Sequence, residues 1–278
     1  MINFAKQNLC ATFDRLRRAR RTALIPFIVG GDPDSATTAS LLLRLEDAGA
    51  DLIEVGIPFS DPLADGPIIQ RASSRALAHG ATPERVLAAI ASVHQRLHVP
   101  ILCLSYWNPL VQFGQRHTGA RPVPQPFLRA AAASGVAGLI VPDLPLEERG
   151  SLRRVVPRGV LAMILLATPT SPPERLRAIA RASEGFIYYV SVVGTTGVRQ
   201  RLPDGLVQGV QRLKRLTTKP VCVGFGISTP AHAAQVAAIA DGVIIGSALV
   251  QALSNGHGRA ERLRHAERFI RRFRRALA

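Results

Sequence analysis

Cysteine and aromatic residues are scarce in this chain, and their scarcity excludes two kinds of protein. The 278 residues include only Cys10, Cys103 and Cys222, and no pair of them has the CxxC spacing of a redox or metal site. An odd number of unpatterned thiols predicts reduced cysteines in a cytoplasmic protein rather than a disulfide framework. Aromatic side chains make up 5% of the sequence, so the predicted core depends on alanine, leucine, valine and isoleucine.

Long apolar runs and cofactor motifs are also missing. The longest apolar runs, such as Val160–Ala167, are far too short to span a bilayer. The seven histidines are scattered, and none lies in an HxH or HExxH pattern, so no metal site is predicted. No glycine pattern matches a dinucleotide fingerprint. These absences argue against a membrane-spanning protein and favour an activity that needs no cofactor.

Lysine is rare and arginine is abundant, and the formal net charge is +16. The excess is concentrated in two segments, since 15–21 contains five arginines and 259–278 contains eight. Both segments have the pattern of surface helices, and neither carries the interleaved aromatic residues that stack on bases. The sequence therefore favours solvated basic helix faces, with a docking surface for an acidic protein or for nucleic acid as the alternatives.

Apolar runs typical of buried strands alternate with amphipathic stretches along the chain. The predicted strands are Ala23–Val29, Asp51–Gly56, Val99–Tyr106, Val136–Val141, Val160–Leu166, Gly185–Val190, Pro220–Val223 and Gly242–Ile245. The predicted helices between them are Ser35–Ala48, Pro83–Leu97, Pro126–Ser134, Leu146–Val156, Pro172–Ser183, Leu206–Leu216 and Thr229–Ala238. The strand-like runs are continuously apolar, which is typical of parallel strands covered on both faces.

Eight strands separated by helices in about 250 residues favour an α/β fold of the (β/α)8 TIM-barrel type. We expect one domain over 1–278, with an extra N-terminal helix and a basic C-terminal helix. A doubly wound open sheet is the alternative, but it generally has fewer strands. Gly114–Pro126 has two glycines, three prolines and no apolar period, which predicts a mobile loop.

Two carboxylates accompany the second predicted strand. Glu54 lies within an apolar run, where burial of an unpaired charge is costly. Asp65 lies in the proline-rich loop that follows, after a first loop aspartate, Asp61. Reactive groups of barrels come from the carboxyl ends of strands and the loops after them, so Glu54 and Asp65 are the predicted catalytic pair. The alternatives are a strand-end ion pair for Glu54 and turn-forming roles for the aspartates.

Glycine-rich segments follow the last two predicted strands. Gly224–Ser228 and the pair Gly246 and Ser247 each close a strand and open a helix. Helix N-termini after strands seven and eight of a barrel are the usual site for a phosphate group. The sequence therefore predicts phosphate binding at this end of the barrel, with tight turns as the alternative.

A small, polar segment and two tyrosines complete the candidate site. Ser191–Arg199 follows the sixth strand, and its glycines together with Thr196 favour a lid that excludes water. A passive loop is the alternative. Tyr106 and Tyr188 end the third and sixth predicted strands, where each is either part of the pocket or a packed aromatic residue.

Several of these segments together resemble the tryptophan synthase alpha subunit family. The matching segments are Pro26-Phe27, Gly31–Pro33, Ala48–Pro67, Tyr106–Pro109, Gly138–Pro145, Gly194–Gly197, Gly224–Ser228 and Gly246-Ser247. They run over nearly the whole chain, and Ala48–Pro67 is highly specific. The resemblance implies a lyase of tryptophan biosynthesis that cleaves indole-3-glycerol phosphate to indole and glyceraldehyde 3-phosphate by a retro-aldol reaction, without a cofactor.

The resemblance also implies roles for individual residues. Glu54 matches the catalytic glutamate of the family, and Asp65 matches its catalytic aspartate. The implied substrate-binding residues are Phe27, Tyr106, Tyr188, Thr196, Gly197, Gly226, Gly246 and Ser247. In this scheme the aromatic residues border the indole ring and Glu54, the glycines and the serine bind the phosphate, and the threonine meets Asp65 when the lid closes.

The family forms an α2β2 tetramer with a β subunit, so the resemblance implies that partner. Three segments depart from the family pattern, one of which is the basic C-terminal helix with its unusually high arginine content. The segment 114–126 is several residues longer and lies near the face that docks the partner, and the lid has Thr195 where members often have valine. A stand-alone lyase and a non-catalytic activator of a β subunit are therefore alternatives, although the intact carboxylates argue against the activator.

Overall fold

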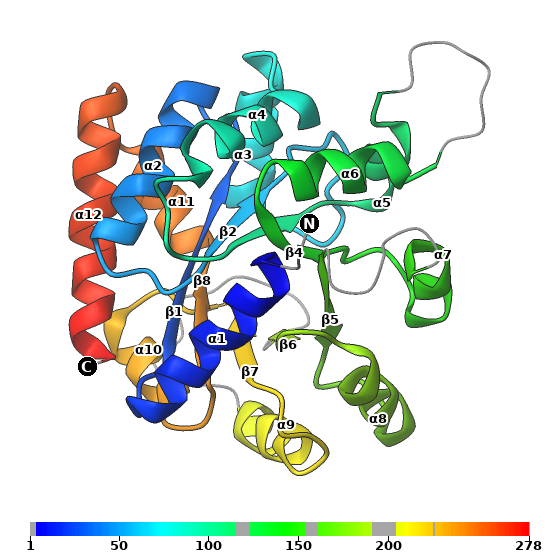
Figure 1. Ribbon diagram of the computed structural model, residues 1–278. Coiled ribbons are helices and arrows are strands. Elements are labelled where there is room, and N and C mark those ends of the chain that lie inside the picture. Colours follow the sequence, from blue (N-terminus) through cyan, green and yellow to red (C-terminus); the bar gives the residue numbers. More distant parts are fainter. Residues whose placement is uncertain (1–3, 115–122, 154–160, 191–203, 225, 278) are drawn as a thin grey trace.

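The protein, seen in a computed structural model, is a closed barrel of eight parallel strands surrounded by helices (Figure 1). The structure describes residues 4–114, 123–153, 161–190, 204–224 and 226–277. The strands are β1 (Ala23–Val29), β2 (Ile53–Gly56), β3 (Ile101–Leu104), β4 (Val136–Ile140), β5 (Ala162–Ala167), β6 (Ile187–Val190), β7 (Val221–Gly224) and β8 (Gly242–Ile245). They pair in chain order, and β8 closes the barrel by pairing with β1. The predicted TIM barrel is confirmed.

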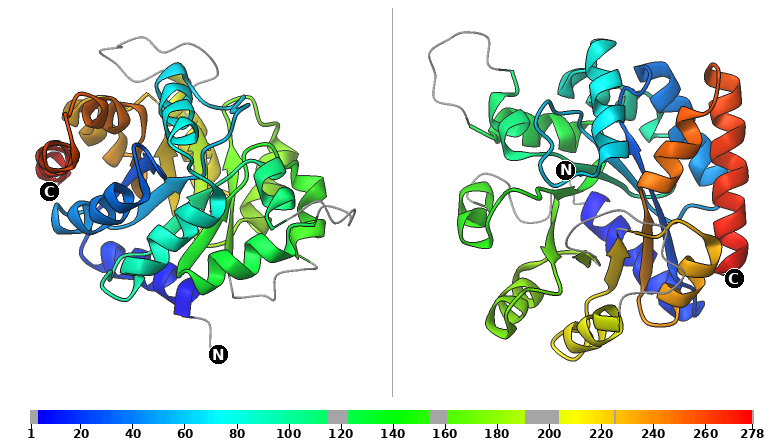
Figure 2. Two further views of the ribbon diagram at one scale, coloured as in Figure 1. Left: turned by 90° about the horizontal axis from the view of Figure 1, so that it is seen from above. Right: turned by 180° about the vertical axis from the view of Figure 1, so that it is seen from behind.

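The eight predicted strands all form, and their bounds lie within two residues of those expected from the sequence. Apolar residues occupy both faces of each strand because both faces are covered. One buried cluster, which includes Leu102, Ile140, Ile164 and Ile244, fills the inside of the barrel. A larger buried cluster fills the layer between the strands and the outer helices, which surround the strands when the barrel is seen from above (Figure 2).

The outer layer consists of helices that follow the strands. They are α2 (Ser35–Asp47), α3 (Pro67–Ala78), α4 (Pro83–His94), α5 (Trp107–Gln112), α6 (Gln125–Ala133), α7 (Arg149–Arg153), α8 (Pro173–Ala182), α9 (Asp204–Lys214), α10 (Pro230–Ala237) and α11 (Ser247–Ser254). The sequence did not predict α3 and α5. The segment predicted as one helix over 146–156 is helical over its described part, as a 3-10 turn at Leu146–Glu148 followed by the short α7, and 154–156 lie outside the described residues.

Capping side chains begin three of these helices where the sequence indicated. The Asp34 carboxylate accepts a hydrogen bond from the backbone N–H of Thr37 at 2.6 Å and begins α2. Thr82 and Thr229 do the same for α4 and α10, each followed by a proline at the first helical position. A cap supplies an acceptor for an N–H that has no partner within the helix, so these local signals set the start of each helix.

Two terminal helices complete the barrel, as expected from the sequence. Helix α1 (Phe4–Arg18) places Leu9, Phe13 and Leu16 in the cluster that fills the barrel, and so covers the amino ends of the strands. Helix α12 (Arg259–Ala276) packs against α2 and α11 through a buried face. None of the helices in the described part of the chain is both long enough and apolar enough to cross a membrane.

A buried carboxylate ties α12 to the start of the barrel. Asp51 precedes β2, and its Oδ2 accepts hydrogen bonds from Arg274 Nη1 at 2.7 Å and from the backbone N–H of Leu24 at 3.0 Å. Arg21 lies 3.5 Å away on the other oxygen. The side chain of Arg274 is only 16% exposed, so this ion pair is little screened by solvent.

Replacing Arg274 with methionine should lower the free energy of unfolding by about 2 kcal/mol, because it leaves a buried carboxylate with only part of its partners. Urea unfolding at pH 7 measures this change. The matched control is Arg271→Met on the same helix, since Arg271 pairs with Glu267 at 3.0 Å on the exposed side. That variant should lose less than about 0.5 kcal/mol. Equal losses in the two variants would contradict a specific role for Arg274.

Candidate active site

Glu54 lies in the second strand with its carboxyl group sealed from solvent. Its neighbours across the sheet are Phe27 in β1 and Leu102 in β3, and Glu54 is 0% exposed. Neither carboxyl oxygen has a hydrogen-bond partner among the residues that the structure describes. Burial, and secondarily the charge of Asp65, raises the pKa of Glu54 to about 8. The group is therefore protonated at neutral pH and is a proton donor.

Asp65 lies in the loop between β2 and α3, and it is held by a tyrosine that follows the next strand, β3. Tyr106 Oη donates to Asp65 Oδ2 at 3.1 Å and accepts from the backbone N–H of Ala64 at 2.9 Å. Burial raises the pKa of Asp65 to about 6, against the opposing effect of the Tyr106 hydrogen bond. Asp65 is therefore largely ionised at neutral pH, and between about pH 6 and pH 8 it is an anion while Glu54 is protonated.

A cavity of about 480 Å³ opens at the carboxyl ends of the strands and reaches Asp65. Its wall is mostly apolar, with Leu104, Leu166 and Val190 among the lining side chains, and Tyr188 from β6 contributes a ring. The pKa of Tyr188 is raised by burial and then by the charges of Glu54 and Asp65. The cavity thus offers an apolar wall for a planar ring beside Asp65, and the buried Glu54 lies within electrostatic range of both Asp65 and Tyr188.

The predicted phosphate site lies at the same end of the barrel. Gly246 is the residue before α11, and a Cβ at this position would lie 3.6 Å from the ring of Phe27. Ser247 is the first residue of α11, so the free N–H groups of that helix begin beside Phe27. Gly226, in the loop after β7, has φ +80°, a conformation that side chains other than glycine rarely adopt.

Part of the predicted site lies outside the described residues. Thr196, Gly197 and the rest of the predicted lid over 191–199 fall in the segment 191–203, and most of the loop predicted over 114–126 falls in 115–122. Among the described residues, two placements differ from those expected. Tyr106 lies two residues beyond β3, next to α5, and Tyr188 lies within β6 rather than at its end.

Sequence comparison identifies the family. The family model for the tryptophan synthase alpha chain matches residues 13–278. The chain belongs to the tryptophan synthase alpha chain family. The reaction of this family is the cleavage of indole-3-glycerol phosphate, so the chain is a carbon–carbon lyase of tryptophan biosynthesis, and the family works with a β subunit.

Individual members of the family are similar to this chain over nearly the full length. The tryptophan synthase alpha chain of Synechocystis sp. is 46% identical over 97% of this chain and 99% of its own length. That of Geotalea daltonii is 46% identical over 89% of this chain and 90% of its own. The crystal structure of the alpha subunit from Legionella pneumophila superposes with a TM-score of 0.86 at 34% identity, covering 100% of this chain and 99% of that one.

The structure adds polar residues at the cavity wall that the sequence analysis missed. Asp143, in the loop after β4, accepts two hydrogen bonds from the backbone N–H of Trp107, at 2.8 and 3.0 Å, and so holds the start of α5. Arg175 from α8 lines the cavity and donates to Glu147 Oε1 at 2.9 Å. The signal for Asp143 was present, because it directly follows a predicted strand of a barrel.

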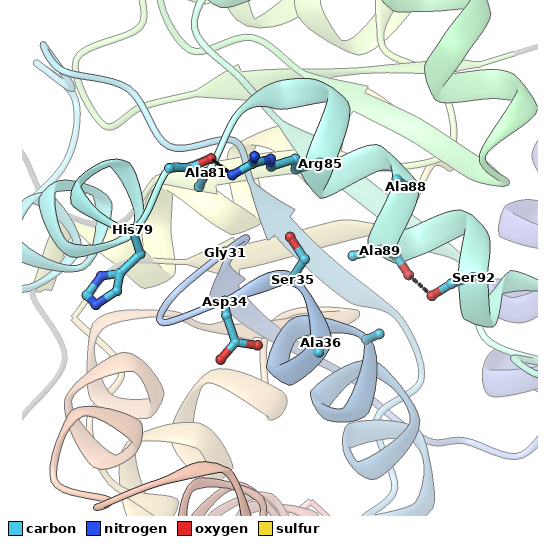
Figure 3. A pocket seen from close by; sticks show the side chains of 12 residues that line it. Gly31, Asp34, Ser35, Ala36, His79, Ala81, Arg85, Ala88, Ala89 and Ser92 are labelled. Carbon is cyan, nitrogen blue, oxygen red and sulfur yellow. Dashed lines mark hydrogen bonds between the residues drawn. The ribbon is translucent and has the colours of Figure 1, made fainter.

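A second cavity, of about 500 Å³, lies between α2 and α4, outside the barrel mouth (Figure 3). Three of its polar side chains are already engaged in local hydrogen bonds. Arg85 donates to the carbonyl oxygen of Gly80 at 2.7 Å, Ser92 donates to that of Ala89 at 2.7 Å, and Asp34 caps α2. Since neither Glu54 nor Asp65 lines it, the cavity beside Asp65 is the candidate active site.

Proposed function

We propose that Glu54 and Asp65 together carry out the retro-aldol cleavage of indole-3-glycerol phosphate to indole and glyceraldehyde 3-phosphate. One observation carries the proposal. Asp65 lines an apolar cavity and lies within electrostatic range of the buried Glu54, and their pKa values of about 6 and about 8 make an anion and a proton donor available together between these values.

Glu54 is proposed to move both protons of the reaction. The protonated carboxyl group donates to C3 of the indole ring, which turns the ring into a cationic tautomer that can accept electrons. The resulting carboxylate then removes the proton from the side-chain hydroxyl group next to the ring. As the carbon–carbon bond breaks, its electron pair returns to the ring, the hydroxyl carbon becomes an aldehyde, and Glu54 is protonated again.

Asp65 is proposed to stabilise the cationic ring as an anion that accepts a hydrogen bond from the ring N–H. Positive charge develops on that nitrogen when C3 is protonated, and a prearranged anion stabilises it without reorganisation of solvent. The hydrogen bond from Tyr106 supports this role, because it fixes the carboxylate and favours its ionised form.

The remaining predicted residues are proposed to bind the substrate. Phe27, Tyr106 and Tyr188 border the indole ring. Gly197, Gly226, Gly246 and Ser247 bind the phosphate, and Thr196 meets Asp65 when the lid closes. The position of Gly246 and Ser247 at the start of α11 supports the phosphate role, since a helix N-terminus attracts an anion.

The dependence of kcat/KM on pH should be bell-shaped, with limbs near pH 6 and pH 8. Activity rises as Asp65 loses its proton and falls as Glu54 loses its own. Tyr106→Phe removes the hydrogen bond that lowers the pKa of Asp65, so the acid limb should move to higher pH and kcat/KM at pH 6 should fall about tenfold. The basic limb is the internal control. Movement of both limbs together would contradict this assignment.

The partner is proposed to be a β subunit in an α2β2 tetramer in the cytoplasm. Leu63, in the loop that carries Asp65, is 93% exposed, which is unusual for a large apolar side chain beside a catalytic residue. A partner that covers Leu63 would order this loop and accelerate cleavage. Leu63→Asp should therefore lose most of the stimulation by a β subunit and keep the basal rate. Leu77→Asp, on α3, is the control for an exposed leucine.

Indole release from indole-3-glycerol phosphate, measured with and without a β subunit from the same source, tests the proposed function. We expect slow release by the chain alone and an increase of at least about tenfold with the partner. Fast release that the partner does not change would indicate a stand-alone lyase. No release in either case, with partner binding retained, would indicate a non-catalytic activator.

A further inference from the structure

Basic side chains gather at the amino ends of the barrel strands, opposite the cavity that carries Asp65. They are Arg17, Arg20, Arg21, Arg181, Lys214 and Arg215, and all six are exposed. We call this surface the basic floor. Thr22, Pro220 and Asp241 border it, and each directly precedes a strand, which locates the floor at that end of the barrel. Helices α1, α8 and α9, which carry or directly precede these side chains, lie in the lower half of Figure 1.

The basic floor is continuous across three helices. A hollow of about 270 Å³ is lined by Arg17, Arg20, Arg21 and Lys214. A neighbouring hollow of about 480 Å³ is lined by Arg181, Lys214 and Arg215. Lys214 belongs to both hollows. Segments far apart in the sequence thus form one surface with two depressions.

Positive charge on the basic floor exceeds the negative charge that the described chain supplies there. Lys214 pairs with Asp241 at 2.9 Å, Arg21 lies 3.5 Å from Asp51, and Arg17 lies 3.8 Å from Asp14. Arg20, Arg181 and Arg215 form no ion pair with any described residue. Three cationic groups are therefore available to an external anion.

The backbone at Arg20 gives a second, independent observation. Arg20 ends the turn after α1 with φ +52°, and no other described residue except glycine has a positive φ. Glycine is the usual residue in this left-handed conformation, because a side chain strains it. Arg20 thus has a backbone conformation that is strained for any residue with a side chain. It also forms no ion pair with any described residue.

We propose that the basic floor binds the phosphate backbone of double-stranded nucleic acid without reading its bases. The guanidinium group forms paired hydrogen bonds with phosphate oxygens, and the hollows give these groups room to surround a phosphate. No aromatic side chain is exposed on the floor for stacking on single-stranded bases, since Phe13 is 4% exposed.

An acidic protein fits the same surface less well. Protein interfaces have an apolar centre with large anchoring side chains. Leu216, 38% exposed, is the one exposed large apolar side chain of the described chain that borders the floor. A surface rich in arginine and poor in apolar anchors favours contact with phosphate groups alone.

Fluorescence anisotropy of the full chain with two labelled 20-base-pair duplexes of unrelated sequence, at several salt concentrations, tests the proposal. We expect equal affinities for both and a slope of log K against log salt of about −4, as for four phosphate contacts, three from Arg20, Arg181 and Arg215 and one from Arg17, whose pair with Asp14 at 3.8 Å is exposed. The triple variant Arg17→Gln, Arg20→Gly, Arg215→Gln should reduce the slope to about −1 and weaken binding at least tenfold at 50 mM salt. Arg20→Gly relieves the left-handed backbone, and indole release should stay unchanged.

The control variant is Arg71→Gln, Arg129→Gln, Arg264→Gln, which removes the same charge from exposed positions on α3, α6 and α12, away from the floor. It should retain the slope and most of the affinity. An equal loss in both triple variants would overturn the proposal, because net charge alone would then explain binding. Displacement by polyglutamate as effective as by unlabelled duplex, or no binding at low salt, would also overturn it.

Discussion

Replacing Glu54 with glutamine should lower kcat for indole release by about 10³-fold or more while the barrel stays folded. The substitution keeps the size of the side chain but removes the carboxyl group that is proposed to donate one proton and then accept another. Loss of a general acid or base lowers the rate by up to about 10⁴-fold. Single-turnover release of indole at pH 7 measures the effect. Circular dichroism and urea unfolding of the same sample check that the variant is folded.

The same substitution should also change how the free energy of unfolding depends on pH. The folded protein binds the Glu54 proton up to pH about 8, whereas an unfolded glutamic acid releases it near 4.5. The stabilisation is therefore complete below pH 4.5 and is lost as the pH rises through about 8. The wild-type free energy of unfolding should fall by roughly 3 kcal/mol between pH 5 and pH 8 from this group. Glu54→Gln should show a much shallower decline.

Glu84→Gln is the matched control for both measurements. It makes the same chemical change at an exposed position in the first turn of α4. Its rate and its pH dependence of unfolding should equal those of the unmodified chain. A Glu54→Gln variant with more than a tenth of the original rate would show that another group moves the protons.

Replacing Asp65 with asparagine should lower kcat/KM by about 10²- to 10³-fold, the usual loss when one prearranged electrostatic group is removed. Asparagine still accepts the hydrogen bond from Tyr106, so the loop should keep its position. The residual activity should no longer show the acid limb near pH 6, because the titrating group is gone. Initial rates between pH 5 and pH 9 measure both effects.

Asp61→Asn is the control in the same loop, since Asp61 is exposed and hydrogen-bonded to Ser60. The sequence indicates that Asp61 shapes the loop, and its neutralisation should change the rate less than about threefold. If both aspartate variants lose activity equally, loop conformation rather than the Asp65 charge would be responsible. If Asp65→Asn raises KM alone, the residue would bind substrate without stabilising the cationic ring.

Much of this fold follows from short stretches of sequence. The strands were predictable because each is a continuous apolar run, and burial on both faces is a property of every residue in the run. The starts of α2, α4 and α10 were predictable because a capping side chain acts within three residues of itself. Glu54 stood out for the same local reason, since a carboxylate in an apolar run has no neighbour in the chain to neutralise it.

Helices α3 and α5 show where local patterns fail. Helix α5 has six residues and contains Pro109, which is too short for an apolar period to be recognised. Its start depends on Asp143, which lies 36 residues away in the chain. Helix α3 does begin with a proline at its first position, a signal that the preceding proline-rich loop concealed.

The sequence by itself determined the barrel and the residue types of the site, because burial patterns and helix caps act over a few neighbouring residues. Only the tertiary structure decided how those residues work together. The hydrogen bond from Tyr106 to Asp65 spans 41 residues, and the ion pair of Asp51 with Arg274 spans 223. The raised pKa values of Glu54 and Asp65 likewise depend on burial among distant strands. Such distances and burial are properties of packing in three dimensions, which no local pattern of residues encodes.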